Sequence, residues 1–301
     1  MVRTEPTSAA IRTEGLTKFY GDVRGVEDLD LEVRRGELFG FLGPNGAGKS
    51  TTIRLLLDLL RPTSGRVEVL GIVPSSSVEL RRSLGYLPGE LSLYEDLTGA
   101  QLLEFFAALR GVTDLGYAHD LADRLGLDLG RPIRALSRGN KQKVGLVQAF
   151  FHRPDLLILD EPTSGLDPLV QHEFQSILKE TVSEGRTVFL SSHVLSEIEH
   201  VTHRVGIIRS GRLVVVEQIA NLKAKAIRRL DVLLARDVAP DGLADVPGVR
   251  SLDIEGRRVR LTVEGSMDGV IKALAAYEVD DLISEEPDLE EIFLAYYQEE
   301  A

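Results

Sequence analysis

The chain of 301 residues is long enough for one large domain and a small one, and its 43% hydrophobic content can fill a core. It contains no cysteine, which excludes disulfide frameworks and thiolate metal sites, and no apolar run reaches the roughly 20 residues of a membrane-spanning helix. The net charge is −12, and residues from Arg228 onward include 18 acidic and 8 basic ones, which argues against a nucleic-acid-binding scaffold.

The first predicted elements are strands. Residues 11–20 predict a strand that ends at Tyr20 and is broken by Gly21. A turn at Arg35-Gly36 then leads into a short apolar run, residues 38–42, which is typical of a buried strand.

The loop after this run has the pattern G-x-x-x-x-G-K-S and precedes a predicted helix over 51–60. Glycines let the backbone curl so that successive N–H groups meet phosphate oxygens, and the helix adds its positive N-terminal end. We expect Lys49 to reach the β- and γ-phosphates of a nucleotide and Ser50 to bind Mg²⁺. The residues expected to contact the nucleotide are Gly43, Pro44, Asn45, Gly46, Ala47, Gly48, Lys49, Ser50 and Thr51.

The middle of the chain changes from alternating strands and helices to helices alone. Its elements are expected to form a helical subdomain over about residues 89–152. Before this subdomain, strands are predicted over 66–70 and 84–87 and a helix over 75–82. Within it, helices are predicted over about 98–111, 117–125 and 140–151.

Two carboxylates, Asp160 and Glu161, follow a continuous apolar run at residues 156–159 that predicts a strand buried on both faces. Parallel sheets bind ligands at the carboxyl ends of their strands. We therefore expect Asp160 to hold Mg²⁺, directly or through water, and Glu161 to act as general base for the attacking water. His193 follows another predicted strand, over 187–190, and on its own is more typical of a structural histidine.

The last part of the chain predicts a second, small domain. Its strand and helix order, β-α-β-β-α-β with a terminal helix, is typical of a ferredoxin-like fold. The end of the first domain is predicted to contain helices over 168–182 and 193–200 and a hairpin over 205–216 that turns at Ser210-Gly211. The second domain is predicted to contain strands over 230–234, 249–254, 257–263 and 282–284 and helices over 241–246, 268–277 and 288–297.

The motifs together, in this order, resemble the ATPase subunits of ATP-binding cassette (ABC) transporters. They are the phosphate loop, the segment Leu136 to Asn140, the run from Leu156 to Pro168, and Ser191-Ser192-His193. The resemblance covers about residues 11–222 and implies an α/β fold: a P-loop ABC ATPase domain, with a mixed sheet core and a helical subdomain, over 1–222, followed by a small α+β accessory domain over 223–301.

The resemblance also implies residue roles. Two ATP molecules would be held between two such domains in antiparallel arrangement. The implied assignments are Tyr20 to the adenine ring; Ser137, Arg138, Gly139 and Asn140 to the signature loop that contacts the ATP of the opposite subunit; Asp167 to the loop joining the two sites; and His193 to sensing the γ-phosphate.

The chain departs from the family pattern at Gly89, where a glutamine usually contacts Mg²⁺ and the attacking water. Glycine has no side chain for this, so either Glu90 or a water takes that place. Asn140 likewise replaces the usual glutamine of the signature loop. The segment 136–144 and the tail Leu-Glu-Glu-Ile-Phe are similar to the drug and antibiotic exporter branch, such as daunorubicin-resistance ATPases.

The resemblance implies a peripheral ATPase subunit at the cytoplasmic face of the membrane. With ATP and Mg²⁺ it would power a separate permease for drug, antibiotic or lipid-like cargo, as a homodimer or paired with a similar chain. The alternatives are an importer subunit, a soluble ABC ATPase acting on ribosomes or DNA, and a regulatory ATP-binding protein without turnover. The last conflicts with the presence of Lys49, Asp160, Glu161 and His193. The accessory domain is expected to perform no chemistry. It regulates or supports dimerisation, or else the apolar face of its predicted terminal helix, with Leu289, Ile292, Phe293 and Tyr296, only closes its own core.

Overall fold

The computed structural model describes residues 9–194, 199–225, 227–237 and 242–285. The chain divides into two compact units, Met1–Val216 and Glu217–Ala301. Each unit has its own hydrophobic core.

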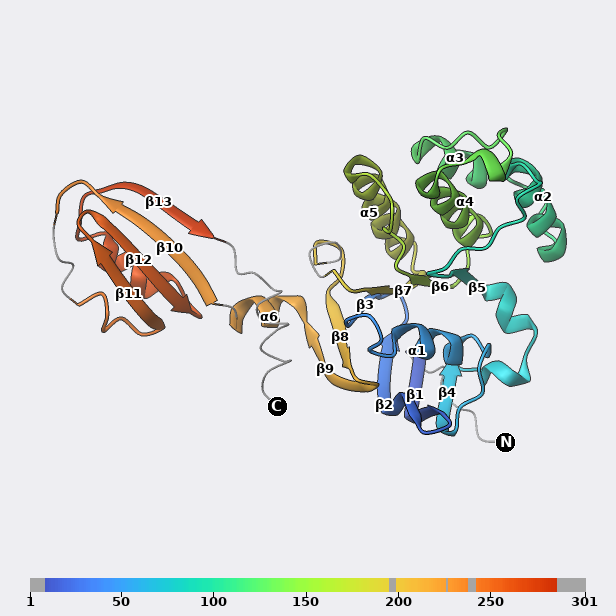
Figure 1. The fold of residues 1–301 in the computed structure, drawn as a ribbon, viewed down its shortest axis with the longest axis horizontal. Helices are drawn as coiled ribbons and strands as arrows, with labels where there is room; N and C mark the ends of the chain where they lie inside the picture. The colour runs from blue at the N-terminus through green and yellow to red at the C-terminus, as the bar shows by residue number, and fades with distance from the viewer. Residues whose placement is uncertain (1–8, 195–198, 226, 238–241, 286–301) are drawn as a thin grey trace. The chain divides into compact units, whose positions relative to one another are not determined.

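The first unit is built on a six-stranded sheet (Figure 1) with the strand order β5-β6-β7-β3-β8-β9. Its first five strands in this order pair in parallel. Every residue of β3, β6 and β7 is buried, which confirms the buried strands that the apolar runs predicted for β3 and β6. The strands are β3 Leu38–Leu42, β5 Leu84–Leu87, β6 Leu156–Asp160, β7 Thr187–Ser192, β8 Arg204–Arg209 and β9 Arg212–Gln218.

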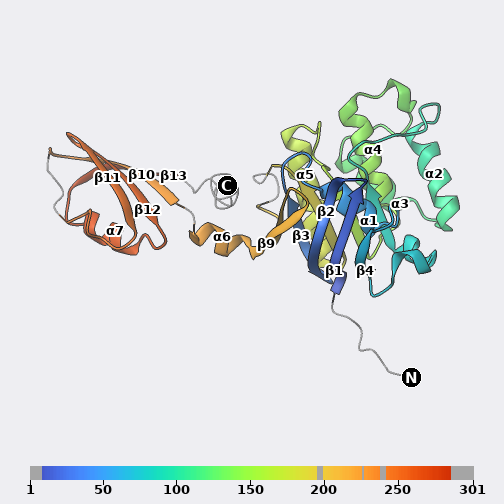
Figure 2. The same ribbon diagram turned by 60° about the horizontal axis from the view of Figure 1, so that its bottom comes forward.

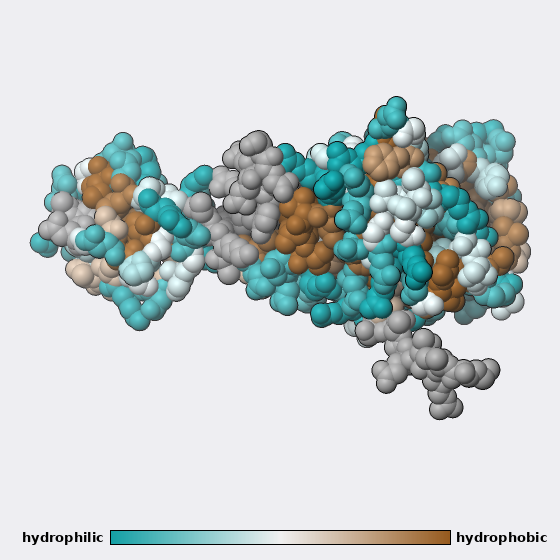
Figure 3. All heavy atoms as spheres, turned by 90° about the horizontal axis from the view of Figure 1, so that it is seen from below, coloured by the Kyte–Doolittle hydropathy of each residue, from teal (hydrophilic) through white to brown (hydrophobic). Residues whose placement is uncertain are grey.

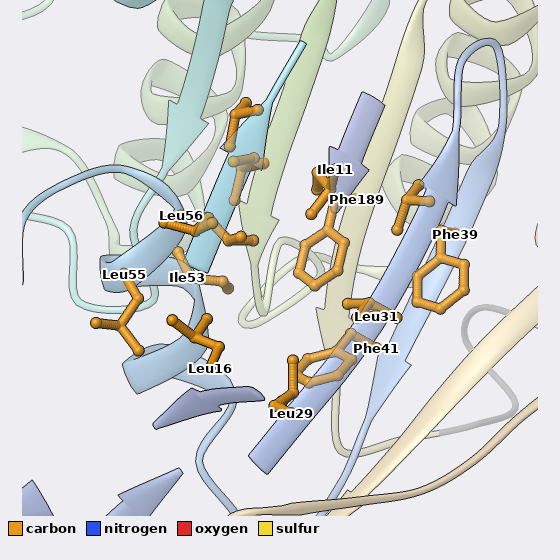
Figure 4. Packing of buried hydrophobic residues seen from close by; sticks show 14 of the residues in the cluster. Ile11, Leu16, Leu29, Leu31, Phe39, Phe41, Ile53, Leu55, Leu56 and Phe189 are labelled. Carbon is orange, nitrogen blue, oxygen red and sulfur yellow. The ribbon is translucent and has the colours of Figure 1, made fainter. Parts of the chain in front are cut away.

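A second, antiparallel sheet of three strands packs beside α1 in the same unit (Figure 2). It consists of β2 (Val23–Arg34), β1 (Ala9–Tyr20) and β4 (Ser64–Val69), in that order. The two sheets and helix α1 (Lys49–Leu56) contribute side chains to one core. Phe189 lies at its centre with its ring centroid 6.0 Å from that of Phe39 and 5.2 Å from that of Phe41 (Figure 4).

Four longer helices complete the first unit, within one or two residues of the predicted bounds at most ends. Thr98 and Gln101 form a reciprocal capping box at the start of α2, and Gly111 ends that helix in the left-handed conformation. The helices are α2 Gly99–Arg110, α3 Gly116–Arg124, α4 Arg138–Phe150 and α5 Pro168–Ser183.

The predicted helix over 75–82 is wrong. The chain instead forms two short 3-10 helices, η1 (Pro74–Ser76) and η2 (Glu79–Ser83). Serine side chains compete with the helix here, because the Ser76 hydroxyl donates to the Val73 carbonyl at 2.6 Å and Ser77 accepts from the Leu80 N–H at 3.3 Å. A third 3-10 helix, η3 (Ile133–Ala135), precedes α4.

The predicted hairpin over 205–216 is confirmed by β8 and β9, which are neighbours in the sheet. Ser210 and Gly211 both have positive φ, 47° and 80°, as a tight two-residue hairpin turn requires. The predicted helix over 193–200 is not formed at residues 193, 194, 199 and 200, and residues 195–198 lie outside the described part.

The second unit contains a four-stranded antiparallel sheet with the order β11-β12-β10-β13. Numbered within the unit, this is the 2-3-1-4 order of the split βαβ fold, and α7 contributes Val270 and Leu274 to its core. The elements are α6 Ile219–Lys225, β10 Ile227–Leu234, β11 Val249–Glu255, β12 Arg258–Glu264, α7 Asp268–Leu274 and β13 Val279–Glu285.

The predicted helix over 241–246 is wrong, because residues 242–248 form turns. Gly242 and Gly248 both have left-handed φ, 84° and 96°, and Pro247 precedes the second of them, so the segment has no room for regular helical turns. The predicted helix over 288–297 lies outside the described residues. In the described part of the chain, no helix is long and apolar enough to cross a membrane.

A half-buried histidine, His152, follows α4 and lies beside the amino-terminal end of β5 in the main sheet. Its Nε2 lies 3.0 Å from the Leu84 carbonyl oxygen. Burial, assisted by Arg110, lowers the pKa of His152 to about 4, against 6.5 in the unfolded chain. Between these values the unfolded chain binds the proton more strongly, so stability falls as the pH falls from about 7 to about 4.

We predict that this histidine removes about 3 kcal/mol of folding free energy between pH 7 and pH 4. His152→Gln, which keeps a donor for the Leu84 carbonyl, should reduce the pH dependence by that amount in urea unfolding at both pH values. The exposed His119, changed to glutamine, is the control. A pH dependence equal to that of the unaltered protein would contradict the assignment.

Candidate active site

The phosphate loop joins the end of β3 to the start of α1. Two of its glycines are required by close backbone approach: a Cβ at Gly43 would lie 2.4 Å from the Ile208 carbonyl oxygen, and one at Gly48, where φ is 111°, would lie 2.7 Å from the Gly25 carbonyl oxygen. Gly48 is also the N-cap of α1 and gives it no side-chain cap. The first N–H groups of the helix are therefore available to an anion.

Lys49 lies at the centre of the site and is only 6% exposed. Its ammonium donates to the carbonyl oxygens of Gly43, at 2.6 Å, and Pro44, at 3.3 Å. It also lies 3.3 Å from Oε1 of Glu161. A buried cation held between the loop and a carboxylate is placed to receive phosphate oxygens.

Asp160 ends β6 and is 4% exposed. One carboxylate oxygen accepts from the Ser50 hydroxyl at 2.8 Å, and the other accepts from the hydroxyl of Ser191 on β7. The parallel register pairs Asp160 with Ser191, which explains this contact. Ser191 belongs to the Ser191-Ser192-His193 motif but was not predicted as a site residue, because its contact with Asp160 depends on strand register.

Glu161 has a left-handed backbone, with φ at 50°, which costs a non-glycine residue about 1 kcal/mol or more. Its N–H donates to the Ser191 carbonyl at 3.2 Å. Its Oε2 lies 2.8 Å from Nδ1 of His193. The strained backbone thus directs the carboxylate between Lys49 and His193, and a carboxylate so placed can accept a proton from a water beside the phosphates.

These groups line one cavity of about 740 Å³. Most of the predicted site residues meet there, although their elements are far apart in the sequence. The predicted residues that line the cavity are Tyr20, Pro44, Asn45, Gly46, Gly48, Lys49, Ser50, Thr51, Glu90, Arg138, Asp160, Glu161 and His193.

Tyr20 ends β1 at the rim of the cavity and is 44% exposed. Its hydroxyl lies 3.5 Å from the Thr51 hydroxyl, and the Lys18 ammonium lies 5.6 Å from the ring centroid. An aromatic side chain in this position presents an apolar surface to a planar base.

The loop after β5 runs along the other side of the cavity. A Cβ at Gly89 would lie 3.2 Å from Oδ2 of Asp160, so the backbone itself approaches the carboxylate where the family pattern has a glutamine. Glu90 is exposed at the rim. Tyr86 also lines the cavity, although it was not predicted as a site residue. Burial, with the charge of Asp160, raises the pKa of its hydroxyl.

The signature residues are mostly outside this cavity. Ser137 caps α4, accepting from the Asn140 N–H at 3.3 Å, and is exposed. Of residues 137–140, Arg138 alone lines the cavity, and its guanidinium donates to the Ser164 hydroxyl at 3.1 Å. Asp167 also lies outside the cavity lining and caps α5, accepting from the Val170 N–H at 3.1 Å.

Comparison with known proteins gives the family. The family model described as ABC transporter matches residues 26–164. The bacitracin transport ATP-binding protein BcrA of Bacillus licheniformis is 38% identical over 232 residues, which is 76% of each chain. This chain belongs to the ABC transporter family. The daunorubicin resistance ATP-binding protein DrrA3 of Streptomyces coeruleorubidus is 36% identical over 301 residues, 95% of each chain.

Solved structures support the same ABC assignment. The ATP-binding subunit of an ABC transporter matches with a TM-score of 0.67 at 32% identity, covering 71% of this chain and 92% of that one. The dimeric ATP-binding cassette MJ0796, bound to ADP and Pi, shares the fold, with a TM-score of 0.64 at 22% identity. The chain is thus an ABC ATPase with an α/β cassette, and the resemblance stated from the motifs is confirmed.

Proposed function

We propose that this ABC ATPase powers a separate membrane permease that exports a drug, antibiotic or lipid-like cargo. The observation that carries the proposal is the similarity to DrrA3 over 95% of both chains, which includes the accessory unit as well as the cassette. A protein named for bacitracin transport is also similar over the cassette. The chain acts as a peripheral subunit at the cytoplasmic face of the membrane.

The chemistry follows from the cavity. The loop N–H groups and Lys49 bind the phosphates of ATP, and Tyr20 stacks on the adenine. Glu161 removes a proton from the water that attacks the γ-phosphate, and His193, 2.8 Å from that carboxylate, orients it. The left-handed backbone at Glu161 keeps the base directed at the phosphates rather than at solvent.

The site fits Mg²⁺ as well as nucleotide. The Ser50 hydroxyl and the Asp160 carboxylate, 2.8 Å apart, present the oxygen ligands that Mg²⁺ prefers. No three His, Cys, Asp or Glu side chains gather as a metal cage in the described ranges, which suits an ion whose shell includes phosphate and water. When bound, Mg²⁺ would neutralise charge on the phosphates.

Two copies, or this chain and a similar one, complete two such sites. Ser137 is exposed at the N-terminus of the thirteen-residue helix α4, where N–H groups and the helix dipole attract an anion, and it does not line the cavity of its own chain. A phosphate held by a second cassette is the ligand that suits this position. The dimer named in the MJ0796 structure provides a precedent for the fold.

The permease needs an apolar contact surface on the cassette. Tyr94, Phe105 and Leu109 are 59%, 43% and 65% exposed, and the rings of Tyr94 and Phe105 meet edge to face at 5.7 Å. Figure 3 shows that hydrophobic side chains reach the surface in separate patches. We assign the patch of Tyr94, Phe105 and Leu109 to the permease.

The experiment is recovery of the tagged full-length chain from detergent-solubilised membranes of its own cells. An integral membrane protein should co-purify, and Phe105→Glu with Leu109→Glu should abolish this while leaving the ATPase activity of the isolated chain unchanged. Leu59→Glu, at an equally exposed leucine, is the matched control. Recovery of the unaltered chain with no membrane protein would contradict the proposal.

The departure at Gly89 yields a prediction about Mg²⁺. Because Glu90 is exposed at the cavity rim, we expect water to replace the missing glutamine. Glu90→Ala and Glu90→Gln should both keep the Mg²⁺ requirement of ATP hydrolysis within about twofold of the original. Ser50→Ala, which removes a ligand, should raise it in the same titration. A higher requirement in Glu90→Ala than in Glu90→Gln would show that Glu90 serves the metal.

A further inference from the structure

The short segment after Glu161 has an unusual need for support. The left-handed backbone of Glu161 is followed by Pro162, which has no N–H. Within the segment, the Ser164 N–H donates to the Glu161 carbonyl at 3.2 Å. A backbone in a sparsely populated conformation persists only where its surroundings hold it from several sides.

A side chain of α4 supplies part of this support. Gln142 is 7% exposed, and its side-chain N–H group donates to the Pro162 carbonyl at 3.1 Å and to the Glu161 carbonyl at 3.4 Å. One buried amide therefore contacts the two consecutive carbonyls that flank the turn carrying the base. This glutamine lies in the segment 136–144, but the sequence pattern gave it no role.

The same turn of α4 contacts the segment at two further points. Arg138, one helical turn before Gln142, donates to the Ser164 hydroxyl at 3.1 Å. A Cβ at Gly139 would lie 2.6 Å from the Gly165 carbonyl oxygen, so the helix backbone itself is in close contact. Residues 138–142 thus hold residues 161–165 along their whole length, and a movement of α4 is transmitted to the base.

We propose that Gln142 is a positioning residue for Glu161: it holds the backbone on either side of the base so that the carboxylate stays directed at the attacking water. This rests on the proposed role of Glu161 as general base. Gln142 lies on the same helix as the exposed signature turn. It therefore also connects the base of its own cassette to the phosphate that the second cassette holds and that α4 contacts.

The test compares steady-state hydrolysis in the full-length protein. Gln142→Met, which keeps the length of the side chain but donates no hydrogen bond, should lower kcat by about ten- to a hundredfold, the cost of a misplaced catalytic group, while the KM for ATP stays within about threefold. Gln142→Glu, which keeps the shape but loses the amide donor, should show the same split. Thr181→Val removes an equally buried side-chain bond, to the Ile177 carbonyl on α5, and should leave kcat unchanged.

A double variant separates positioning from general damage to the fold. If Gln142 acts through Glu161, adding Gln142→Met to Glu161→Gln should cost no further turnover. Two results would overturn the inference. In one, the losses of kcat from the two single variants multiply in the double variant. In the other, Gln142→Met keeps the original kcat while Glu161→Gln is inactive. Original turnover in Glu161→Gln alone would instead refute the proposed base.

Discussion

Replacing Glu161 with glutamine should lower ATP turnover by about a hundredfold or more while leaving ATP binding intact. Glutamine has nearly the shape of glutamate, so the contacts of the strained turn survive. It cannot accept the proton of the attacking water, so hydrolysis loses its base. Phosphate release under saturating ATP measures the turnover, and nucleotide titration measures the binding.

The same variant should reveal the dimer. With hydrolysis blocked, ATP should hold two cassettes together long enough for size-exclusion chromatography to detect the complex. Adding Ser137→Arg should prevent this, because a large side chain at the exposed N-terminus of α4 obstructs the phosphate of the second cassette. Glu79→Gln, at a carboxylate 74% exposed and outside the cavity lining, is the control.

Turnover at the original rate in Glu161→Gln would refute the base assignment.

Replacing Lys49 with alanine should weaken ATP binding itself, by about ten- to a hundredfold. A charge-assisted hydrogen bond contributes about 1.5–3 kcal/mol, and each 1.4 kcal/mol corresponds to a tenfold change in affinity. The change also leaves the Glu161 carboxylate without its cationic partner at 3.3 Å. The measurement is the ATP-dependent rise in the melting temperature, which follows from ligand linkage.

Lys272→Ala is the control for the loss of a lysine, because Lys272 pairs with Asp268 in the second unit and is 74% exposed. It should keep the full ATP-dependent rise in melting temperature. If Lys49→Ala also keeps that rise, the phosphates are bound by the loop N–H groups alone, and the role given to Lys49 is wrong.

The parts of the site that could be predicted are those encoded by short, contiguous patterns. The phosphate loop and the Asp160-Glu161 pair each follow a buried apolar strand, so motif and structural context reinforce each other. Parallel strands then bring these ends together at one sheet edge. The hairpin at Ser210-Gly211 was likewise fixed by local turn chemistry.

The parts that could not be predicted depend on contacts between distant segments. Ser191 reaches Asp160 through strand register, and Gln142 reaches Pro162 across the α4 packing surface; the recognised segments contain both residues but assign neither of them this contact. The segment 75–82 shows a different limit, because serine side chains satisfy the backbone in tighter turns where a helix was predicted. The hydrogen-bonding alternatives of these serines are visible only in the folded chain.

The left-handed backbone at Glu161 lowers the stability of the folded chain at the same residue that the reaction needs as its base. Asparagine adopts this conformation more readily than glutamate, which relieves the backbone strain, and the Lys49 ammonium keeps the Gly43 and Pro44 carbonyls as acceptors. We therefore expect Glu161→Asn to unfold at a higher urea concentration than the original protein while losing its turnover. A population screened only for yield of folded protein would accumulate such changes, whereas one that must hydrolyse ATP retains the strained glutamate.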